Sequence, residues 1–399
     1  MSIDFEIPAE AKAIREKVRR WVHDECIPAE KELDSKPFDE VLGKLRAKAR
    51  TQGLWCPFVP KEYGGMGLPI VAWAAVYEEA ARSIFGPLAI NCMAPDDGNM
   101  NLLSKVGTPE QKEWFLKPIV EGKARSAFAM TEPHPGSGSD PGMMLTRAEK
   151  RNDRYIIRGR KWFITGADGA SNYIVMARTS DDPRRGLTAF LYHKDQPGWR
   201  IVRRIPIMGP EEHGGHCEIE YDGLEVSQEN VLMQEGDGLR VTQIRLGPAR
   251  LTHCMRWLGF AKRCVEIAQE YVSRREGFGI KLADRESIQI KLGDVAHQIE
   301  IGRLLTMQAA WALDQGSRAR KEVSMAKIQV ADALHNAADT AIQLNGARGY
   351  SKDTILEWIY RYARSARLVD GASEVHKMVL ARFLRQQGRD FWHWGVGEK

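Results

Sequence analysis

Apolar residues recur every three or four positions between residue 5 and about residue 125. This spacing places them on one face of a helix and predicts an N-terminal helical region. Pro60 and the run Gly64-Gly65-Met66-Gly67 interrupt the pattern, so we expect helices joined by a tight loop. The first apolar face consists of Ile7, Ala11, Ile14, Val18 and Trp21.

The pattern changes between about residue 126 and residue 235. Short segments at 155–157, 173–177 and 187–191 are rich in β-branched and aromatic residues and are bounded by Gly, Asp, Asn or Pro. In Cys217–Tyr221, apolar and charged residues alternate, as on a strand with one buried face. These features predict a separate β domain with long loops.

Helical periodicity returns from about residue 238 to residue 385, now in longer segments that predict a helical bundle. The tail after Gly388 is aromatic and irregular, and we expect it to dock on a neighbouring part of the protein. The sequence thus predicts a mainly α protein with a central β domain, divided into residues 1–125, 126–237 and 238–399. Two apolar stripes of the last region comprise Leu292, Val295, Ile299 and Leu304, and Ile328, Ala331, Leu334, Ala338 and Ile342.

Composition places the 399-residue chain among soluble globular proteins, with 43% hydrophobic and 28% charged residues. The net charge of +5 is spread along the chain, which disfavours nucleic-acid binding. No stretch reaches the roughly 18 apolar residues of a membrane span. The N-terminus lacks the apolar segment of a secretory signal, and the C-terminal GVGEK is not a peroxisomal signal, so we expect a cytoplasmic protein.

Several familiar sites are not predicted. The six cysteines form no C-x-x-C pair, so we expect buried free thiols and no metal site, and we interpret His213-Gly-Gly-His216 as a turn. The chain contains no P-loop, no dinucleotide-binding G-x-G-x-x-G and no G-x-S-x-G of serine hydrolases. By itself, Gly136–Asp140 reads as a flexible polar loop rather than a phosphate loop, because no convincing helix follows it.

The helix–sheet–helix order and six local motifs resemble the acyl-CoA dehydrogenase family over nearly the whole chain. The resemblance implies an N-terminal helical domain, a β-barrel-like middle domain and a C-terminal four-helix bundle. It also implies an FAD-dependent oxidoreductase of fatty acid β-oxidation, acting on an acyl-CoA. The motifs are Val59–Leu68, Phe128–Pro133 with Ser139-Asp140, Lys161–Gly166, Arg275–Gly279, Gln343–Tyr350 and Val369–His376.

The resemblance assigns roles in FAD binding to residues of the β domain and of the last helical region. A flavin requires an apolar wall and hydrogen-bond partners, and a pyrophosphate requires cationic or N–H donors. Arg275 and the segment 343–349 resemble parts that reach the FAD of a neighbouring subunit, so we expect a homodimer or homotetramer. The implied FAD contacts are Phe128, Met130, Thr131, Ser139, Phe163, Thr165, Arg275, Phe278, Gln343, Gly346, Ala372 and Glu374.

Asp370 stands where the family carries its catalytic carboxylate. The α-proton of a thioester is too weakly acidic for water to remove quickly, so a positioned base is required. The sequence neighbours Val369, Gly371 and Ala372 are apolar or small, and we expect a water-excluding setting. Arg250 matches an arginine that the family places beside the base.

The sequence departs from the family pattern at four places. The base position holds Asp instead of Glu, and Ala372 replaces a threonine of the family motif. Ala249 occupies the alternative base position of some members and cannot act as a base. The loop 134–138 is long, which leaves open whether Ser137 or Ser139 contacts FAD.

These departures resemble a branch that includes acyl-CoA dehydrogenase family members ten and eleven, which carry Asp at the base position. The segments that carry this resemblance are Ala94–Met100, His213–Ile219, Arg245–Arg250 with His253–Arg256, and Asp370-Gly371 with Glu374–His376. The resemblance suggests longer, branched or 4-hydroxylated acyl-CoA substrates, with electron-transferring flavoprotein as acceptor. Two alternatives stay open: an oxidase resembling nitroalkane oxidase, which also uses an Asp base, and a catalytically silent assembly or binding protein with the same fold.

Overall fold

The computed structural model describes residues 6–211 and 213–392. Residues 1–5 and 393–399, on which the expectations for the chain ends partly rest, lie outside the described residues. Contacts along the chain define two compact units. One contains residues 1–58, 67–92 and 250–399, and the other contains residues 59–66 and 93–249. The boundaries expected at residues 125 and 237 remain a prediction.

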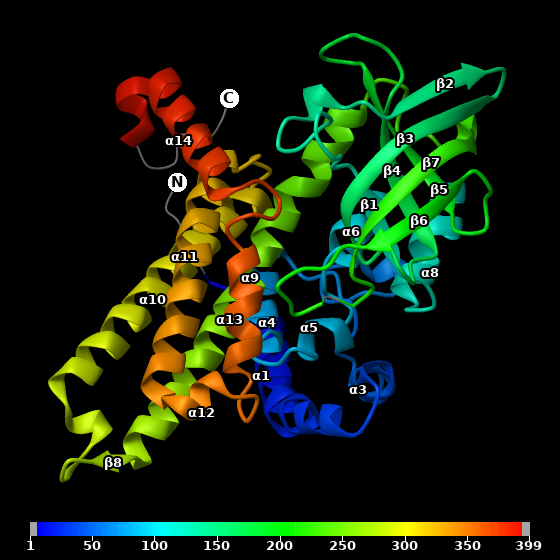
Figure 1. The fold of residues 1–399 in the computed structure, drawn as a ribbon. Helices are drawn as coiled ribbons and strands as arrows, with labels where there is room; N and C mark the ends of the chain where they lie inside the picture. Colours follow the sequence, from blue (N-terminus) through cyan, green and yellow to red (C-terminus); the bar gives the residue numbers. More distant parts are fainter. Residues whose placement is uncertain (1–5, 212, 393–399) are drawn as a thin grey trace. The chain divides into compact units, whose positions relative to one another are not determined.

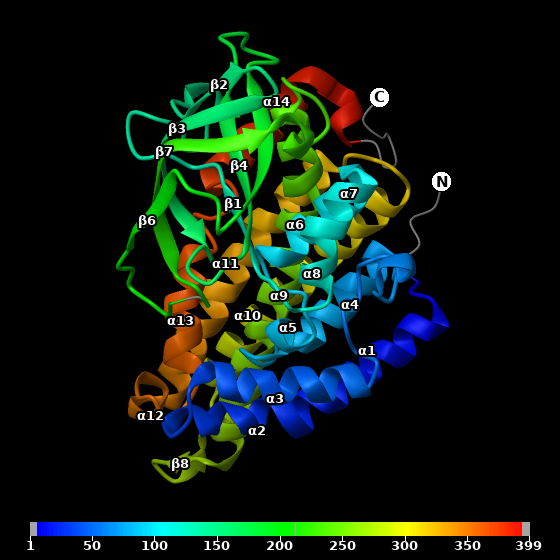
Figure 2. The same cartoon turned by 90° about the vertical axis from the view of Figure 1, so that its right-hand side faces the viewer.

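The first unit is helical (Figure 1). Within it, α10 and α11 run side by side, and α13 and α14 pack against α11 (Figures 1 and 2). Helix α4 contacts both α1 and α10. A short hairpin of β8 (Glu276–Gly277) and β9 (Ile280–Lys281) follows α9. The helices are α1 (Ala9–Trp21), α2 (Ile27–Ala29), α3 (Phe38–Thr51), α4 (Ile70–Ala80), α5 (Gly86–Ala89), the part of α9 (Gly238–Arg274) from residue 250, α10 (Glu286–Asp314), α11 (Arg320–Asn345), α12 (Ala347–Tyr350), α13 (Leu356–Ser365) and α14 (Ser373–Gln387).

The second unit is built on one sheet, which in the described residues has the strand order β1-β4-β2-β3-β7-β6, with β5 paired to β4. Strand β1 runs parallel to β4, and β3 runs antiparallel to both β2 and β7. Helix α6 packs against β1. The elements are β1 (Ser126–Ala129), β2 (Arg147–Arg151), β3 (Arg154–Thr165), β4 (Asn172–Arg178), β5 (Leu187–His193), β6 (Trp199–Arg204), β7 (His216–Ser227), α6 (Asp96–Val106), α7 (Pro109–Gln111) and α8 (Lys117–Val120).

The fold class expected from the hydrophobic pattern is confirmed: along the chain, helical regions precede and follow the strands of a central β sheet. The β-rich segments at 155–157, 173–177 and 187–191 lie in β3, β4 and β5, and Cys217–Tyr221 lies in β7. All six cysteines are buried free thiols, as expected. No helix among the described residues is long and apolar enough to cross a membrane.

The residues of the predicted apolar faces are buried or partly buried with one exception. Of the first face, Ile7, Ala11, Val18 and Trp21 are buried. In α10, however, the side chain of Leu304 is 56% exposed, so its assignment to the buried stripe was wrong. The step of five residues from Ile299 rotates a side chain by roughly 140° around the helix, because each residue advances about 100°. Leu304 therefore points away from the face that Val295 and Ile299 share.

Candidate active site

A buried ion pair organises the segment that follows β1. Lys161 of β3 is fully buried, and its Nζ donates to the main-chain oxygen of Met130 and pairs with Glu132 Oε1, both at 2.9 Å. The main-chain N–H of Trp162 donates to the oxygen of Thr131 at 2.9 Å. Segment 130–132 is therefore fastened along β3, and the predicted flavin contacts Met130 and Thr131 are held at fixed positions.

The electrostatics of this pair follow from burial and mutual attraction. Burial opposes the charge of Glu132, but the Lys161 ammonium and the N–H groups of Leu145 and Thr146 outweigh it and lower the pKa of Glu132 to about 2. Burial lowers the pKa of Lys161 to about 8, against the opposing effect of Glu132. The pair is thus a structural clamp, because both partners are fully engaged.

Phe163 is turned outward at an irregularity of β3. The register with β7 shifts between Lys161 and Ile164, and Phe163 adopts a left-handed backbone with φ of 51°. Its ring is 45% exposed and packs edge-on against Trp162, with centroids 5.0 Å apart. Two residues on, Thr165 Oγ1 lies 3.0 Å from His216 Nδ1. An exposed aromatic ring beside a positioned hydroxyl suits the wall and the polar edge of a flavin.

The two serines of the long loop differ in their surroundings. Ser137 is buried, and its hydroxyl donates to the oxygen of Met130 at 3.3 Å. Ser139 is exposed. Ser139 is therefore the serine whose side chain faces solvent, whereas Ser137 stabilises the loop internally.

Phe128, the first predicted flavin contact, lies under a buried arginine. The Arg245 guanidinium stands 4.2 Å from the centroid of the Phe128 ring. Arg245 Nε donates to Asn99 Oδ1 of α6 at 2.7 Å. The sequence identified Arg245 only as a branch motif, and its cation–π contact was not predicted.

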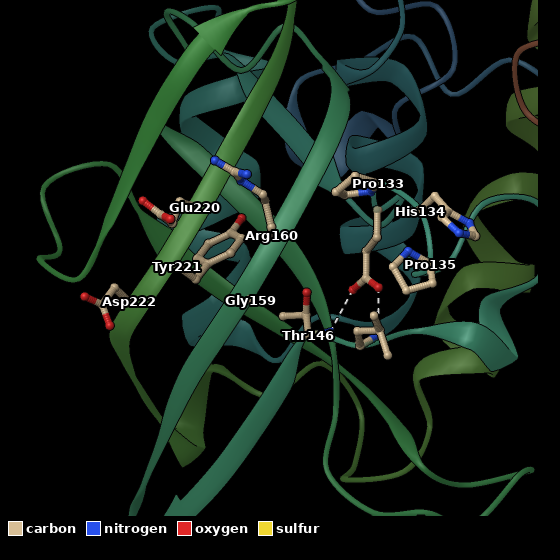
Figure 3. Close-up of a pocket in the computed structure, with 11 residues that line it drawn as sticks. Pro133, His134, Pro135, Thr146, Gly159, Arg160, Glu220, Tyr221 and Asp222 are labelled. Atoms are coloured by element: carbon tan, nitrogen blue, oxygen red, sulfur yellow. Dashed lines mark hydrogen bonds between the residues drawn. The ribbon is translucent and has the colours of Figure 1, made fainter.

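A pocket of about 500 Å³ opens on the same unit (Figure 3). Glu132 lines this pocket, and its carboxylate accepts from the Leu145 and Thr146 N–H groups, so that the clamp forms part of the wall. The remaining lining mixes three charged residues with prolines and other uncharged residues, and it does not include the predicted flavin contacts. The lining residues are Glu132, Pro133, His134, Pro135, Leu145, Thr146, Gly159, Arg160, Glu220, Tyr221 and Asp222.

In the helical unit, Asp370 lies on the loop between α13 and α14. Its backbone is left-handed, with φ of 50°, and Gly371 follows with φ of 95°. Such a conformation is costly for a non-glycine residue and persists only where the surroundings enforce it. Arg250 Nε of α9 donates to the main-chain oxygen of Asp370 at 2.8 Å. The sequence-predicted pair of Asp370 and Arg250 is therefore brought together, through the backbone of the loop.

A buried lysine holds the same loop from α11. Lys327 Nζ donates to the main-chain oxygens of Gly371 at 2.8 Å and Ala366 at 3.2 Å. Burial lowers the pKa of Lys327, whereas the Cys254 thiol and the Asp370 carboxylate act in the opposite direction. Burial also lowers the pKa of Arg250.

The setting of Asp370 differs from the one expected. Its neighbours in sequence are small or apolar, but cationic and imidazole groups from α9 and α11 approach it in space, and His253 Nε2 lies 3.4 Å from Asp370 Oδ2. The neighbours in sequence did not predict these groups, because residues more than 40 positions away in the chain supply them. The Asp370 side chain is nevertheless only 23% exposed.

The helix N-terminus that follows the loop contains a second imidazole. His376 of α14 is buried, its Nδ1 lies 3.1 Å from Ser324 Oγ, and a methyl group at Gly371 would stand 3.2 Å from its Nε2. Burial and the charges of Lys327 and Arg250 lower the pKa of His376 to about 4. His376 is therefore a neutral packing partner of the loop at ordinary pH. Ala372 and Glu374 lie beside it, at the start of α14.

The remaining predicted cofactor residues lie on exposed parts of the helical unit. Arg275 and Phe278 belong to the β8–β9 hairpin, and the Phe278 side chain is fully exposed. Gln343 and Gly346 lie at the end of α11 and are exposed. This exposure is compatible with contact to a second subunit, which stays a prediction. Among the described residues, no group of three or more His, Cys, Asp or Glu side chains is arranged to hold a metal ion.

Sequence reasoning missed three residues around Asp370. His253 and Arg256 appeared only as branch markers, and Lys327 lies in an otherwise apolar helical stripe. A buried lysine on an apolar helix face is unusual, since such a residue is rarely buried without partners. That irregularity was the signal available for Lys327.

Comparisons with known proteins cover most of the chain. Residues 8–123, 127–224 and 236–385 match the models of the N-terminal, middle and C-terminal domains of acyl-CoA dehydrogenase. The chain is 36% identical to "Probable acyl-CoA dehydrogenase FadE2" of Mycobacterium tuberculosis, over 95% of this chain and 96% of that protein. It is 36% identical to acyl-CoA dehydrogenase family member 11 of Gallus gallus, over 92% of this chain but only 49% of that protein.

A solved structure supports the fold. The structure of a putative acyl-CoA dehydrogenase from Mycobacterium abscessus superposes with a TM-score of 0.89 at 34% identity, over 96% of this chain and 99% of that one. In contrast, the chain spans only about half the length of the family member 11 protein of Gallus gallus.

Proposed function

The chain belongs to the acyl-CoA dehydrogenase family of FAD-dependent oxidoreductases, and we propose that it converts an acyl-CoA thioester to the trans-2-enoyl-CoA with Asp370 as general base. Bound FAD supplies the acceptor for the hydride that leaves the β-carbon. The Asp370 carboxylate removes the α-proton, and the double bond forms between the α- and β-carbons. We propose electron-transferring flavoprotein as the electron acceptor and a homodimer or homotetramer as the working form.

The observation that carries the choice of base is the held loop conformation. Asp370 is a non-glycine residue at φ of 50°, and Arg250 and Lys327 bind the main-chain oxygens of Asp370 and Gly371. Fixing the backbone fixes the position of a short side chain, which has few rotatable bonds of its own. The same contacts place positive charge beside the carboxylate, which favours the ionised form that a base requires.

The fit of FAD rests on the donor set of the β unit. Phe163 supplies an exposed aromatic wall, and Thr131 and Thr165 supply groups for the polar edge of the ring system. For the nascent enolate, the required hydrogen-bond donors are those of the oxyanion type. In the family, one is the backbone N–H of the catalytic residue, here Asp370.

The substrate is proposed by analogy. The branch that carries Asp at the base position suggests a longer, branched or 4-hydroxylated acyl-CoA. An aspartate is one methylene shorter than glutamate, so the acyl chain or the loop must approach more closely. Gly371, which has no side chain, leaves room for that approach.

The experiment is an anaerobic titration of the FAD-loaded protein with butanoyl-, octanoyl-, hexadecanoyl- and 4-hydroxylated acyl-CoAs, monitored by flavin absorbance. At least one acyl-CoA should bleach the flavin. The Asp370→Asn variant should retain FAD, and its rate of flavin bleaching should fall by roughly 100-fold or more, because general-base catalysis contributes about 10²–10⁴-fold in rate. Undiminished reduction in this variant would refute Asp370 as the base.

The same material separates the alternatives. Oxygen consumption without an added acceptor would indicate an oxidase instead of a dehydrogenase. A flavin that no acyl-CoA bleaches would indicate a silent assembly or binding protein. Reduced enzyme that passes electrons to electron-transferring flavoprotein would support the proposed acceptor.

A further inference from the structure

One imidazole faces the proposed base directly. His253 of α9 places its Nε2 at 3.4 Å from Asp370 Oδ2, and the side chain of His253 is only 13% exposed. Arg250 and His253 are three residues apart on α9, so they share a helix face, and both contact Asp370. Arg250 reaches the main-chain oxygen, whereas His253 approaches the carboxylate.

The hydrogen bond on the other side of the ring assigns its tautomer. Arg256 Nη2 lies 3.4 Å from His253 Nδ1, and a guanidinium can only donate. Nδ1 is therefore the acceptor and carries no proton. The proton of the neutral ring is then on Nε2, which is the nitrogen that faces Asp370. Arg256 is completely buried and has a further bond to the oxygen of Cys92 at 2.9 Å, so the donor itself is fixed.

The plane of the imidazole is also fixed. Its ring stacks on Trp257, with centroids 5.2 Å apart and planes at 26°, and the Trp257 side chain is buried. Lys327 Nζ lies 5.5 Å from the centroid of the same indole. The stacked indole therefore blocks rotation of the His253 ring, and the Nε2–H group can point in only one direction.

We propose that His253 is a positioning residue for the base: its neutral ring donates from Nε2 to Asp370 Oδ2 and leaves Oδ1 to take the α-proton. This inference rests on the proposed function of Asp370. A carboxylate whose second oxygen is held cannot rotate freely, and misplacement of a reacting group by about 1 Å can cost 10²-fold in rate. A short aspartate has most need of such a partner, because it reaches the substrate with one methylene fewer than glutamate.

The charged and titratable groups that face His253 are known for each packed element. Helix α9 contributes Arg250 and Arg256, helix α11 contributes Lys327, and the loop before α14 contributes Asp370. Arg256 stands on the side of Nδ1 and Lys327 stands against the indole, whereas the Asp370 carboxylate stands on the side of Nε2. The donor therefore has a single acceptor direction within this group.

The test compares two variants of matched purpose. His253→Phe keeps a flat ring for stacking on Trp257 and removes the donor. His253→Gln removes the ring and keeps an amide N–H at about the position of Nε2. Each is purified with FAD and mixed anaerobically with the acyl-CoA that bleaches the wild type fastest in the panel above. Flavin content, acyl-CoA affinity and the limiting rate of reduction are measured.

We expect the flavin of the His253→Phe variant to be reduced roughly 10- to 100-fold more slowly than that of the wild type. Its FAD content and acyl-CoA affinity should be unchanged. His253→Gln should recover most of that rate, and the isotope effect of α-deuterated acyl-CoA should rise in the Phe variant. His253→Leu, which also lacks a donor, replaces the Phe variant if that protein does not load FAD.

Two results would overturn the proposal: equal rates in the Gln and Phe variants, or a loss that appears only in acyl-CoA affinity. Failure of the proposed function gives a different result, because then the wild type is not bleached or Asp370→Asn still reacts.

Discussion

Two buried lysines, one in each unit, hold segments that carry predicted site residues, and they differ in what balances their charge: Lys161 holds predicted flavin contacts, and Lys327 holds the loop of the proposed base. Lys161 has a carboxylate partner, Glu132, at 2.9 Å, together with the oxygen of Met130. Lys327 instead donates to two main-chain oxygens, those of Ala366 and Gly371. If one partner of a buried ion pair is removed, the other is left as an unpaired charge in a medium of low dielectric constant. If a cation that binds only carbonyl oxygens is removed, what remains is unpaired dipoles and not an unpaired charge. The first lysine should therefore matter most to folding, and the second to the position of the base.

Lys161→Met gives the largest expected effect. It leaves the Glu132 carboxylate buried without its cation, and the free energy of unfolding should fall by about 3–5 kcal/mol. Urea unfolding monitored by circular dichroism measures the change. The exposed pair of Lys150 and Glu235, at 3.8 Å, supplies the control: Lys150→Met should cost less than about 1 kcal/mol. Adding Glu132→Gln to Lys161→Met should restore part of the loss, and a double variant as unstable as the single one would contradict the pairing argument.

Acid should reveal the same pair through its linkage to stability. The pKa of Glu132 is lowered in the folded protein, from the ordinary 4.5 to about 2. A carboxyl group with a depressed folded pKa contributes stability that is present above the unfolded value and is lost as pH falls through the folded one. We expect wild-type stability to decline between about pH 4.5 and pH 2 more steeply than that of the Lys161→Met/Glu132→Gln double variant. Parallel curves in urea unfolding at stepped pH values would show that Glu132 is not the linked group.

Lys327→Met should separate function from folding. Its loss removes two charge-assisted hydrogen bonds to the base loop but also removes a costly buried cation, so the free energy of unfolding should fall by only about 2 kcal/mol. The rate of flavin reduction should fall more than tenfold, because the loop that carries Asp370 loses its anchor. Lys321 on the same helix donates to the main-chain oxygen of Phe391 at 3.2 Å, and Lys321→Met is the matched control that should leave reduction unchanged. Equal loss of rate in both variants would break the distinction between the two lysines.

The sequence predicted the elements better than the environment of the base. Alternation and β-branched residues located strands β3, β4, β5 and β7, because a strand that buries one face must alternate. The motif around Asp370 located the loop between α13 and α14. The surroundings of the carboxylate were not predictable from its neighbours in sequence, since His253 and Lys327 reach it from other helices. Tertiary contacts of this kind carry no local periodic signal.

Leu304 and the two buried lysines show the same limit of predicting burial from the hydrophobic pattern, one as an exposed apolar residue and the others as buried charged residues. A five-residue step within an apolar stripe looked helical but turned the side chain to solvent. Lys161 and Lys327, in contrast, are charged residues within apolar runs and are nevertheless buried. A pattern of hydrophobic positions predicts which face is buried, whereas the partner that makes a buried charge tolerable is fixed only by the fold.

Gly371→Ala should produce the smallest of these effects and tests the loop from the side opposite to Lys327. Gly371 has φ of 95°, and an added methyl group would stand 3.2 Å from His376 Nε2, so both the backbone and a buried neighbour must shift. Gly388 has φ of 56°, and no atom of the described residues lies within 4 Å of the added methyl group, so that this variant measures the backbone cost alone. We expect Gly388→Ala to cost about 1 kcal/mol, and Gly371→Ala slightly more, because an L-residue in the left-handed region is strained by about 1–2 kcal/mol.

Only Gly371→Ala should also slow flavin reduction, by a few-fold, since its methyl group displaces the loop that Lys327 anchors. Thermal unfolding and anaerobic reduction of both variants measure the two effects. If Gly371→Ala reduces its flavin at the wild-type rate while losing stability, the base tolerates movement of its loop, and the proposed role of Lys327 as the anchor of the base would have to be abandoned.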